Sequence, residues 1–200
     1  MKTMKHLLAI LALMTVSDAS GGDLEDLIAK AGDGDATAQY EVGQKILTGD
    51  GVPKNTEEAI KWLQKSAALG NADAQMSLGS LYVRGKDIPK NSTEAAMWFL
   101  LAAEQGKAPA QIQMARMHIA GAGVVKDNVE AWKWAQLAQD QGDPQANQIL
   151  VFLRTHMTAA QMTAAREFVQ EFKTRQAADA AAKGIPMVAP PLDVKQSEDP

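Results

Sequence analysis

Histidine and cysteine, the side chains that most often transfer protons near neutral pH or bind transition metals, are scarce in this chain. Its 200 residues include three histidines and no cysteine. His6 lies in an N-terminal leader, and His118 and His156 are too far apart for a motif such as His-x-x-x-His. We therefore predict no catalytic residue, no metal site and no cofactor, and we interpret the two later histidines as structural.

Two other segments resemble ligand-binding loops only in part. Asp33 and Asp35 alternate as in a calcium-binding EF-hand loop, but Gln44 stands where that loop needs a bidentate glutamate, so we interpret the pair as a helix N-cap. The segment Gly49-Asp50-Gly51 lacks the Gly-Lys-Ser/Thr ending of a phosphate-binding loop. Asn91-Ser92-Thr93 matches the glycosylation sequon, although a helix cap is the stronger explanation for Asn91.

Composition favours an all-helical protein that does not bind nucleic acid. Hydrophobic residues make up 46% of the chain but aromatic residues only 5%, and alanine supplies much of the difference. Such a composition suits helices that pack through small side chains better than a β-sheet. The formal net charge of −4 argues against a nucleic-acid partner.

The N-terminal residues 1–19 have the pattern of a signal peptide. Lys2 and Lys5 precede the uncharged apolar run 7–16, and Ser17-Asp18-Ala19 fits a small-x-small cleavage site. The apolar run is about half of the roughly 20 residues that a bilayer-spanning helix requires, although an uncleaved anchor or a buried helix remains an alternative. We expect a protein secreted across the inner membrane, periplasmic or else extracellular, with no membrane insertion after cleavage.

A repeat of 36 residues organises the rest of the chain. Glycine, alanine and glutamine recur in one register, with Asn147 in place of the fourth glutamine, and Trp62, Trp98 and Trp134 recur further along. The aligned positions near the start of each unit are Gly34/Gly70/Gly106/Gly142, Ala38/Ala74/Ala110/Ala146 and Gln39/Gln75/Gln111. So many coincidences in one register indicate a repeat architecture.

Each unit predicts two helices, 36–47 and 56–69 in the first copy. The intervening Gly-Asp-Gly-Val-Pro segment breaks the helix, and Asn55 stands three residues before Glu58 in a capping-box spacing, with the glutamate expected to reach back. Small residues at Gly43 and Gly79 should let the two helices of a unit approach closely. We expect the recurring tryptophans to fill the core between units, whereas Trp132 is out of register and is a candidate for binding.

The C-terminal third changes character after the third unit. Residues 144–153 resemble a fourth first helix, and Thr158 with Gln161 forms a new capping signal after His156, which we place in a break. We therefore predict a lead helix at 20–35, repeats at 36–71, 72–107 and 108–143, a partial repeat at 144–153, a capping helix within 154–183 and a disordered tail at 184–200.

The combined motifs resemble those of the Sel-one-like repeats, relatives of the tetratricopeptide repeats. The resemblance rests on Ala-x-Ala-Gln-x-x-Val-Gly from Ala36, Gly-x-Gly-Val-Pro-Lys-Asn from Gly49, Glu58-Ala59-x-x-Trp62 and the closing Gly70. It implies a right-handed superhelical solenoid of antiparallel helix pairs whose members mostly act as adaptors in protein complexes. Some cysteine-rich relatives are described as β-lactamase-like, but the cysteines are absent here.

We interpret the chain as an interaction scaffold that binds a protein or peptide on the concave face of its first helices. The alternative is a cell-envelope hydrolase, β-lactamase-like or wall-active, or a peptidoglycan-binding protein. Leucine and methionine side chains could seat an apolar anchor there, and arginines could supply oriented charge. The candidate partner-binding residues are Gln44, Met76, Ser80, Leu81, Arg84, Gln113, Arg116 and Met117.

Overall fold

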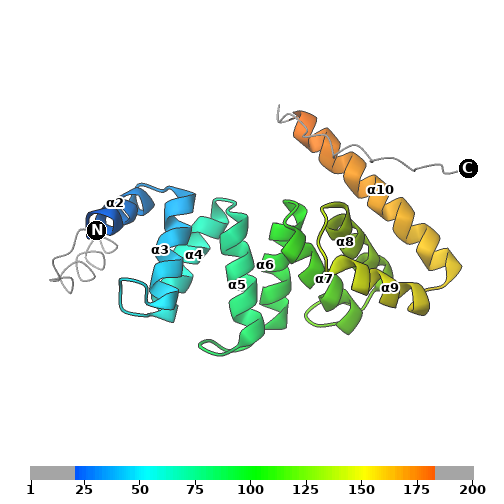
Figure 1. Ribbon diagram of the computed structural model, residues 1–200, viewed down its shortest axis with the longest axis horizontal. Helices are drawn as coiled ribbons and strands as arrows, with labels where there is room; N and C mark the ends of the chain where they lie inside the picture. The colour runs from blue at the N-terminus through cyan, green and yellow to red at the C-terminus, as the bar shows by residue number, and fades with distance from the viewer. Residues whose placement is uncertain (1–20, 183–200) are drawn as a thin grey trace, which may run out of the picture.

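The computed structural model describes residues 21–182, and every regular element in this range is an α-helix (Figure 1). The predicted signal peptide at 1–19 and the predicted tail at 184–200 lie outside the described residues. The helices are α2 (Gly21–Gly32), α3 (Ala36–Thr48), α4 (Thr56–Ala68), α5 (Ala72–Arg84), α6 (Ser92–Glu104), α7 (Ala108–Ala120), α8 (Asn128–Asp140), α9 (Ala146–His156) and α10 (Ala159–Ala182).

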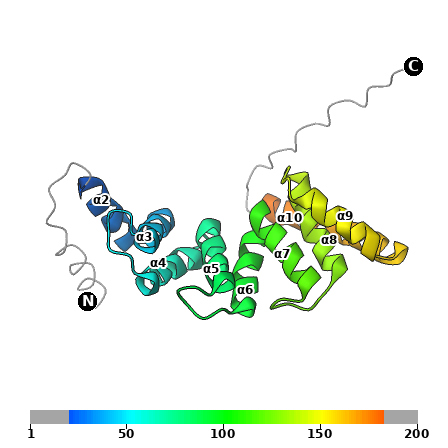
Figure 2. The ribbon, with the colours of Figure 1, turned by 60° about the horizontal axis from the view of Figure 1, so that its bottom comes forward.

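Helices α3 to α8 form three successive antiparallel pairs that follow one another along a curved row (Figure 2). This arrangement confirms the predicted solenoid, and the helices predicted at 36–47 and 56–69 agree with α3 and α4 within one residue at each end. Gly49, Gly85 and Gly121 end the first helices in the left-handed conformation, at φ angles of 82°, 61° and 68°. None of the described helices is both long enough and apolar enough to cross a bilayer.

The second helix of each pair begins at a side-chain cap. Asn55 Oδ1 accepts the Glu58 N–H at 3.1 Å, as predicted. The expected return bond from the Glu58 carboxylate is wrong, because the Asn55 N–H donates to the Ile46 carbonyl at 3.0 Å and Glu58 pairs with Lys61 at 3.2 Å. The Asn91 N–H likewise donates to Tyr82 and the Asp127 N–H to His118. The cap residue therefore also ties the loop to the first helix.

The two helices of a pair approach through matched large and small residues. A Cβ added at Gly43 would lie 3.0 Å from the Leu63 side chain, and one added at Gly79 would lie 2.6 Å from the Phe99 ring. In the third unit the glycine position is Ala115, and the position of the opposing large side chain is Ala135. Glycine thus stands opposite a large side chain, and alanine replaces it where the opposing side chain is small.

Buried glutamines join each unit to the one before it. Gln39, Gln75 and Gln111 donate their side-chain N–H to the carbonyls of Ala31, Ala67 and Ala103, each at 3.1 Å. The Oε1 atoms of Gln75 and Gln111 accept from the side chains of Gln105 and Gln141, at 2.8 and 2.9 Å. In the first unit Leu69 occupies the equivalent position, and Gln39 Oε1 is buried without a partner among the described residues.

The recurring tryptophans occupy the predicted core positions, with one difference between units. Trp62 and Trp134 are buried, whereas Trp98 is only partly buried. The prediction that Trp132 is a binding residue is wrong, because its side chain is 3% exposed within the core and the Arg154 guanidinium on α9 lies over its ring. The out-of-register position faces the next helix of the stack instead of solvent.

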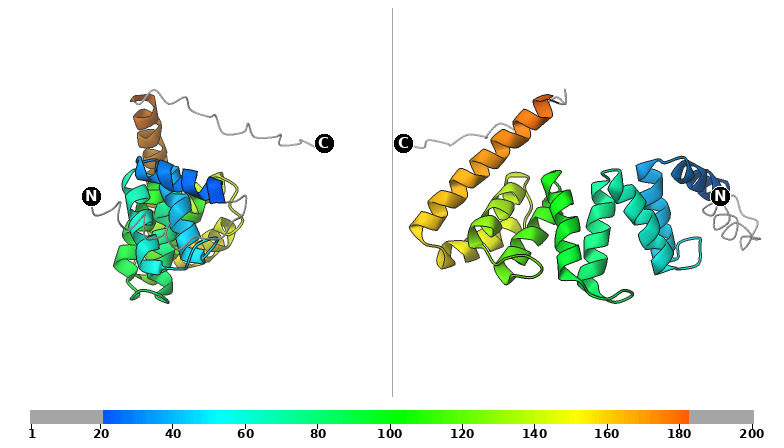
Figure 3. Two further views of the ribbon diagram at one scale, coloured as in Figure 1. Left: turned by 90° about the vertical axis from the view of Figure 1, so that its left-hand side faces the viewer. Right: turned by 180° about the vertical axis from the view of Figure 1, so that it is seen from behind.

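Helix α10 caps the C-terminal end by packing against α8 (Figure 3). Its predicted capping box is confirmed, since Thr158 and Gln161 exchange hydrogen bonds. An apolar stripe of α10, formed by Ala165, Phe168, Val169 and Phe172, faces α8, where Phe172 meets Trp134 edge to face at 5.4 Å. The buried Lys133 lies beneath this stripe, with its ammonium 4.3 Å from the Phe168 ring centroid. His156 belongs to the last turn of α9, not to the break that follows it.

The fit at Gly79 predicts a specific packing defect. Gly79→Ala should destabilise the protein by about 1–3 kcal/mol, because the new methyl group overlaps the Phe99 ring. Urea denaturation of the single and double variants with Phe99→Ala measures the effect. The destabilisation caused by Gly79→Ala should be smaller in the Phe99→Ala background than in the parent chain. Equal destabilisation in the two backgrounds would contradict direct overlap of the methyl group with the ring.

The unpaired amide oxygen of Gln39 predicts a stabilising substitution. Leu69→Gln should raise the free energy of unfolding by about 0.5–1.5 kcal/mol, because it supplies the donor that Gln105 and Gln141 provide in the later units. Thermal denaturation tests this expectation. The gain should disappear in a Gln39→Leu background, and a gain that persists there would mean that removing the exposed leucine is the cause.

Candidate functional site

A groove of about 490 Å³ lies between the first helices α3 and α5. The loops that follow these two helices and the start of α7 also line it. Five of the eight predicted partner-binding residues line it. These residues are Gln44, Met76, Ser80, Leu81 and Arg84. The structure thus brings together the candidates of the first two units.

The three candidates of the third unit lie outside this groove. Arg116 donates a hydrogen bond to Gln145 Oε1 at 2.7 Å, so it points along the stack toward the start of α9. Gln113 is partly buried on α7. Met117 is only 6% exposed and belongs to the hydrophobic core, so its expected role as an exposed anchor is corrected. It differs from its equivalent Leu81 because α7 packs against α9 as well as α8.

Polar contacts between neighbouring units hold the walls of the groove. Gln44 Nε2 on α3 donates to Ser77 Oγ on α5 at 2.7 Å. Lys54 pairs with Asp87 at 3.2 Å across the loops of the first two units. Within the second unit, Lys107 at the start of α7 pairs with Asp73 on α5 at 2.6 Å. These pairs are partly exposed, so each contributes no more than about 1 kcal/mol, and their main effect is to orient the walls.

The remaining lining combines apolar surface with positive charge. Leu47, Met76 and Leu81 are partly exposed within the groove. Arg84 and Lys86 also line it, and neither forms an ion pair within residues 21–182. The groove is therefore more basic than the chain as a whole, whose net charge is −4. Such a surface suits a ligand with both an apolar and an acidic group.

Sequence reasoning missed the charged residues that border the groove. Lys54 recurs in every unit as Lys90 and Lys126, and that recurrence was the available signal. Asp73, Lys86, Asp87 and Lys107 differ between the units, so the repeat pattern gives no indication of their role. Asp87 meets Lys54 because the loops after α3 and α5 lie side by side, and Lys107 meets Asp73 because the start of α7 lies beside the start of α5.

Neither described histidine lies in the groove. His118 Nδ1 lies 3.1 Å from the Val125 carbonyl, where it holds the loop after α7. His156 stacks on Phe152 at 4.1 Å between ring centroids. No group of three metal-binding side chains comes together in residues 21–182.

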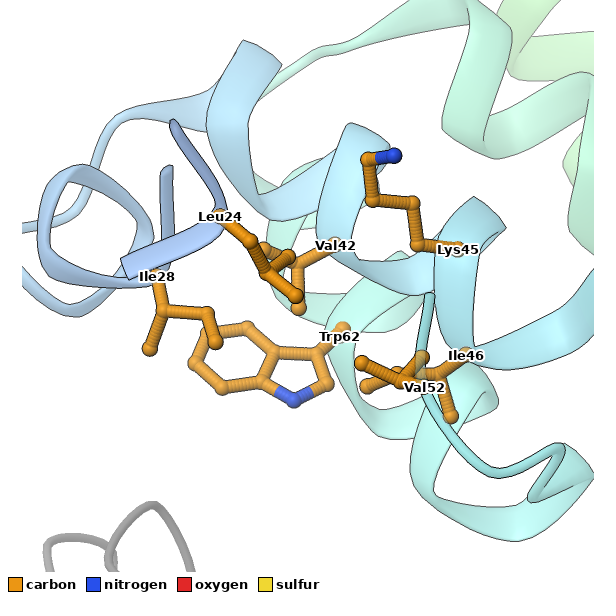
Figure 4. Close-up of a pocket in the computed structure, with 7 residues that line it drawn as sticks. All are labelled: Leu24, Ile28, Val42, Lys45, Ile46, Val52 and Trp62. Atoms are coloured by element: carbon orange, nitrogen blue, oxygen red, sulfur yellow. The ribbon is translucent and has the colours of Figure 1, made fainter. Parts of the chain in front are cut away.

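A second, smaller hollow lies at the N-terminal end of the stack (Figure 4). Its lining is apolar and includes Leu24 and Ile28 of α2, Val42 of α3 and the ring of Trp62. The free volume is about 10 Å³, close to the minimum for a single water molecule. The ammonium group of Lys45 points away from the indole (Figure 4). This hollow is part of the packing between α2 and the first unit.

Comparison with known proteins gives concordant matches. The Sel1 repeat model matches residues 36–71, 72–107 and 108–143. The structure of a Sel1 repeat protein from Oxalobacter formigenes is 39% identical, with a TM-score of 0.61, and the match covers 64% of this chain and 96% of that one. The protein c5321, a protective antigen present in uropathogenic Escherichia coli strains, is 30% identical with a TM-score of 0.68.

These matches differ in how much of each protein they cover. The match to c5321 covers 88% of this chain but only 38% of that longer one. Helicobacter pylori cysteine rich protein B is 23% identical with a TM-score of 0.51, over 66% of this chain and all of that one, and it shows the fold alone. No curated protein matches the sequence of this chain.

The matched repeats cover more than half of the sequence and coincide with the three helix pairs of the structure. Sel1 repeat proteins are generally scaffolds for protein–protein interaction, and most are not enzymes. Because three Sel1 repeats match this chain, and because it covers 96% of the Oxalobacter protein at 39% identity, the chain belongs to the Sel1 repeat family.

Proposed function

We propose that the chain is an exported scaffold that binds a protein or peptide partner in the groove between α3 and α5. The observation that supports this proposal is the groove itself, where side chains from two units converge on an open apolar and basic surface. The Gln44–Ser77 bond and the two flanking ion pairs hold the surface in place before a partner arrives. A preorganised site loses less conformational entropy on binding.

The lining suggests the chemistry of the bound segment. Met76 and Leu81 offer contacts for an apolar side chain, and Arg84 and Lys86 can pair with a carboxylate nearby. The partner segment should therefore combine an apolar residue with an acidic group. Interfaces of this kind depend on a few central residues, so Leu81 and Arg84 should dominate the binding energy.

Site-specific photocrosslinking in the native host tests the groove. A benzophenone amino acid at Ser80 should form an adduct with the partner, whereas the same group at the repeat-equivalent Arg116 should not, because that position lies outside the groove. The double variant Leu81→Asp, Arg84→Glu should reduce the Ser80 adduct at least about tenfold, a loss of about 1.4 kcal/mol or more. Mass spectrometry of the adduct identifies the partner.

Two outcomes would contradict the groove assignment. One is an equal adduct from position 116, and the other is an adduct at position 80 that survives the double variant. Helical circular dichroism of each variant must match that of the parent chain. The substituted side chains are not fully buried, so the fold should tolerate the changes.

Export is the second part of the proposal, and it rests on the sequence of residues 1–19. We expect the mature protein to begin at Ser20 and to be recovered in the periplasmic fraction, as determined by mass spectrometry of the N-terminal peptide. Leu11→Arg should leave an unprocessed precursor in the cytoplasm, because a charge in the apolar run prevents its recognition. Full-length parent protein in the cytoplasm would refute export without affecting the groove.

A further inference from the structure

Helix α6 exposes an apolar face that the equivalent helices α4 and α8 do not expose. Met97, Leu100 and Leu101 are 46%, 36% and 39% exposed. The equivalent residues are Lys61, Gln64 and Lys65 on α4, and Lys133, Gln136 and Leu137 on α8. Contiguous exposed apolar residues on a soluble protein usually indicate a surface that another segment covers.

The tryptophan beneath this face differs from its two equivalents in the same way. The Lys65 ammonium lies 4.1 Å from the ring centroid of Trp62, and the Lys133 ammonium lies 4.4 Å from that of Trp134. Trp134 is also covered by Phe172 of α10. Within residues 21–182, Trp98 has no cation over its ring and stays partly exposed. Its unit therefore lacks the cover that the other two units possess.

Helix α10 extends beyond α8 toward α6 (Figures 1 and 3). A cleft lies between α6 and α10, and it borders the exposed apolar face at Leu101. The cleft measures about 790 Å³, and its walls include Trp98 and Leu101 on α6 and Phe172 on α10. Gln176 on α10 donates to the Glu104 carbonyl of α6 at 2.8 Å, which spans the cleft at one point. Phe172 also packs on Trp134, so the cleft adjoins the α8–α10 interface. Beside the apolar side chains, its lining includes the charged residues Glu104, Arg175 and Asp179.

The sequence directly after α10 fits this cleft. Residues 185–192 read Ile-Pro-Met-Val-Ala-Pro-Pro-Leu, an uncharged apolar segment with three prolines. Aromatic-lined grooves are the usual receptors of proline-rich segments, whose polyproline II conformation rises about 3.1 Å per residue. Asp179, one turn before the end of α10, already lines the cleft. The end of α10 therefore lies beside the cleft, and the segment follows it directly in the sequence.

We propose that residues 185–192 of the same chain occupy the cleft between α6 and α10 and cover Met97, Leu100 and Leu101. In this position the segment completes the C-terminal cap. This inference is independent of the proposed function. It also replaces, for these residues, the expectation that the whole of 184–200 is disordered.

Disulfide trapping provides a direct test because the chain has no cysteine of its own. In the full chain, Leu101→Cys with Met187→Cys should form an intramolecular disulfide in a glutathione buffer at least about tenfold faster than two control pairs, since docking raises the effective concentration of the two thiols. The controls keep one partner each: Leu101→Cys with Ser197→Cys, and Val125→Cys with Met187→Cys. Non-reducing gels and peptide mapping identify the products.

Deletion of residues 184–200 provides a second readout. It should increase the fluorescence of a hydrophobic dye, and adding Met97→Lys and Leu101→Lys to the deleted chain should reverse the increase, because lysine is what α4 presents at these positions. Equal trapping rates for all three pairs, or dye binding unchanged by the deletion, would overturn the proposal. Intermolecular disulfides between Leu101→Cys single variants at the same rate would also overturn it, because a second copy would then cover α6.

Discussion

The architecture depends on a buried amide at every junction between complete units. A glutamine side chain inside the stack must satisfy both its donor and its acceptor, since an unpaired buried polar group costs about 1–3 kcal/mol. Gln75 meets this requirement only if the last turn of α4 presents the Ala67 carbonyl and the end of α6 presents Gln105. The bond to Ala67 therefore ties the second unit to the first, and the bond from Gln105 ties α5 to α6 within the second unit, a directional constraint that nonspecific apolar packing cannot supply.

The same constraint explains where the regular stack ends. The fourth unit has Asn147 at the glutamine position, and that side chain is exposed. Helix α9 is instead held by buried apolar residues, of which Leu150 and Leu153 are almost completely buried. Without a fixed polar junction α9 packs on both α7 and α8, and the polypeptide then reverses into α10. The third unit therefore has a different environment although its sequence follows the same pattern.

Most of the fold could be predicted from the sequence, because helix ends and unit boundaries depend on residues that recur. The groove could be predicted only in part. Met117 and Leu81 are equivalent in the alignment of the units, yet Met117 is buried and Leu81 is partly exposed, because burial depends on which helix lies beside each unit. The prediction that Trp132 is a binding residue failed for the same reason. Its register suggested a surface position, but the end of the stack places α9 over it.

Differences between equivalent positions are therefore more informative about function than the repeated residues. The recurring glycines, glutamines and tryptophans are all explained by packing and hydrogen bonding, so they do not distinguish this chain from any stack of the same kind. Arg84 and Lys86 at the groove, and Met97 and Leu101 on α6, depart from their equivalents and lie at surfaces that stability alone does not explain. Replacing a lysine with an exposed methionine or leucine loses favourable hydration, so such a position is best understood through the segment that covers it.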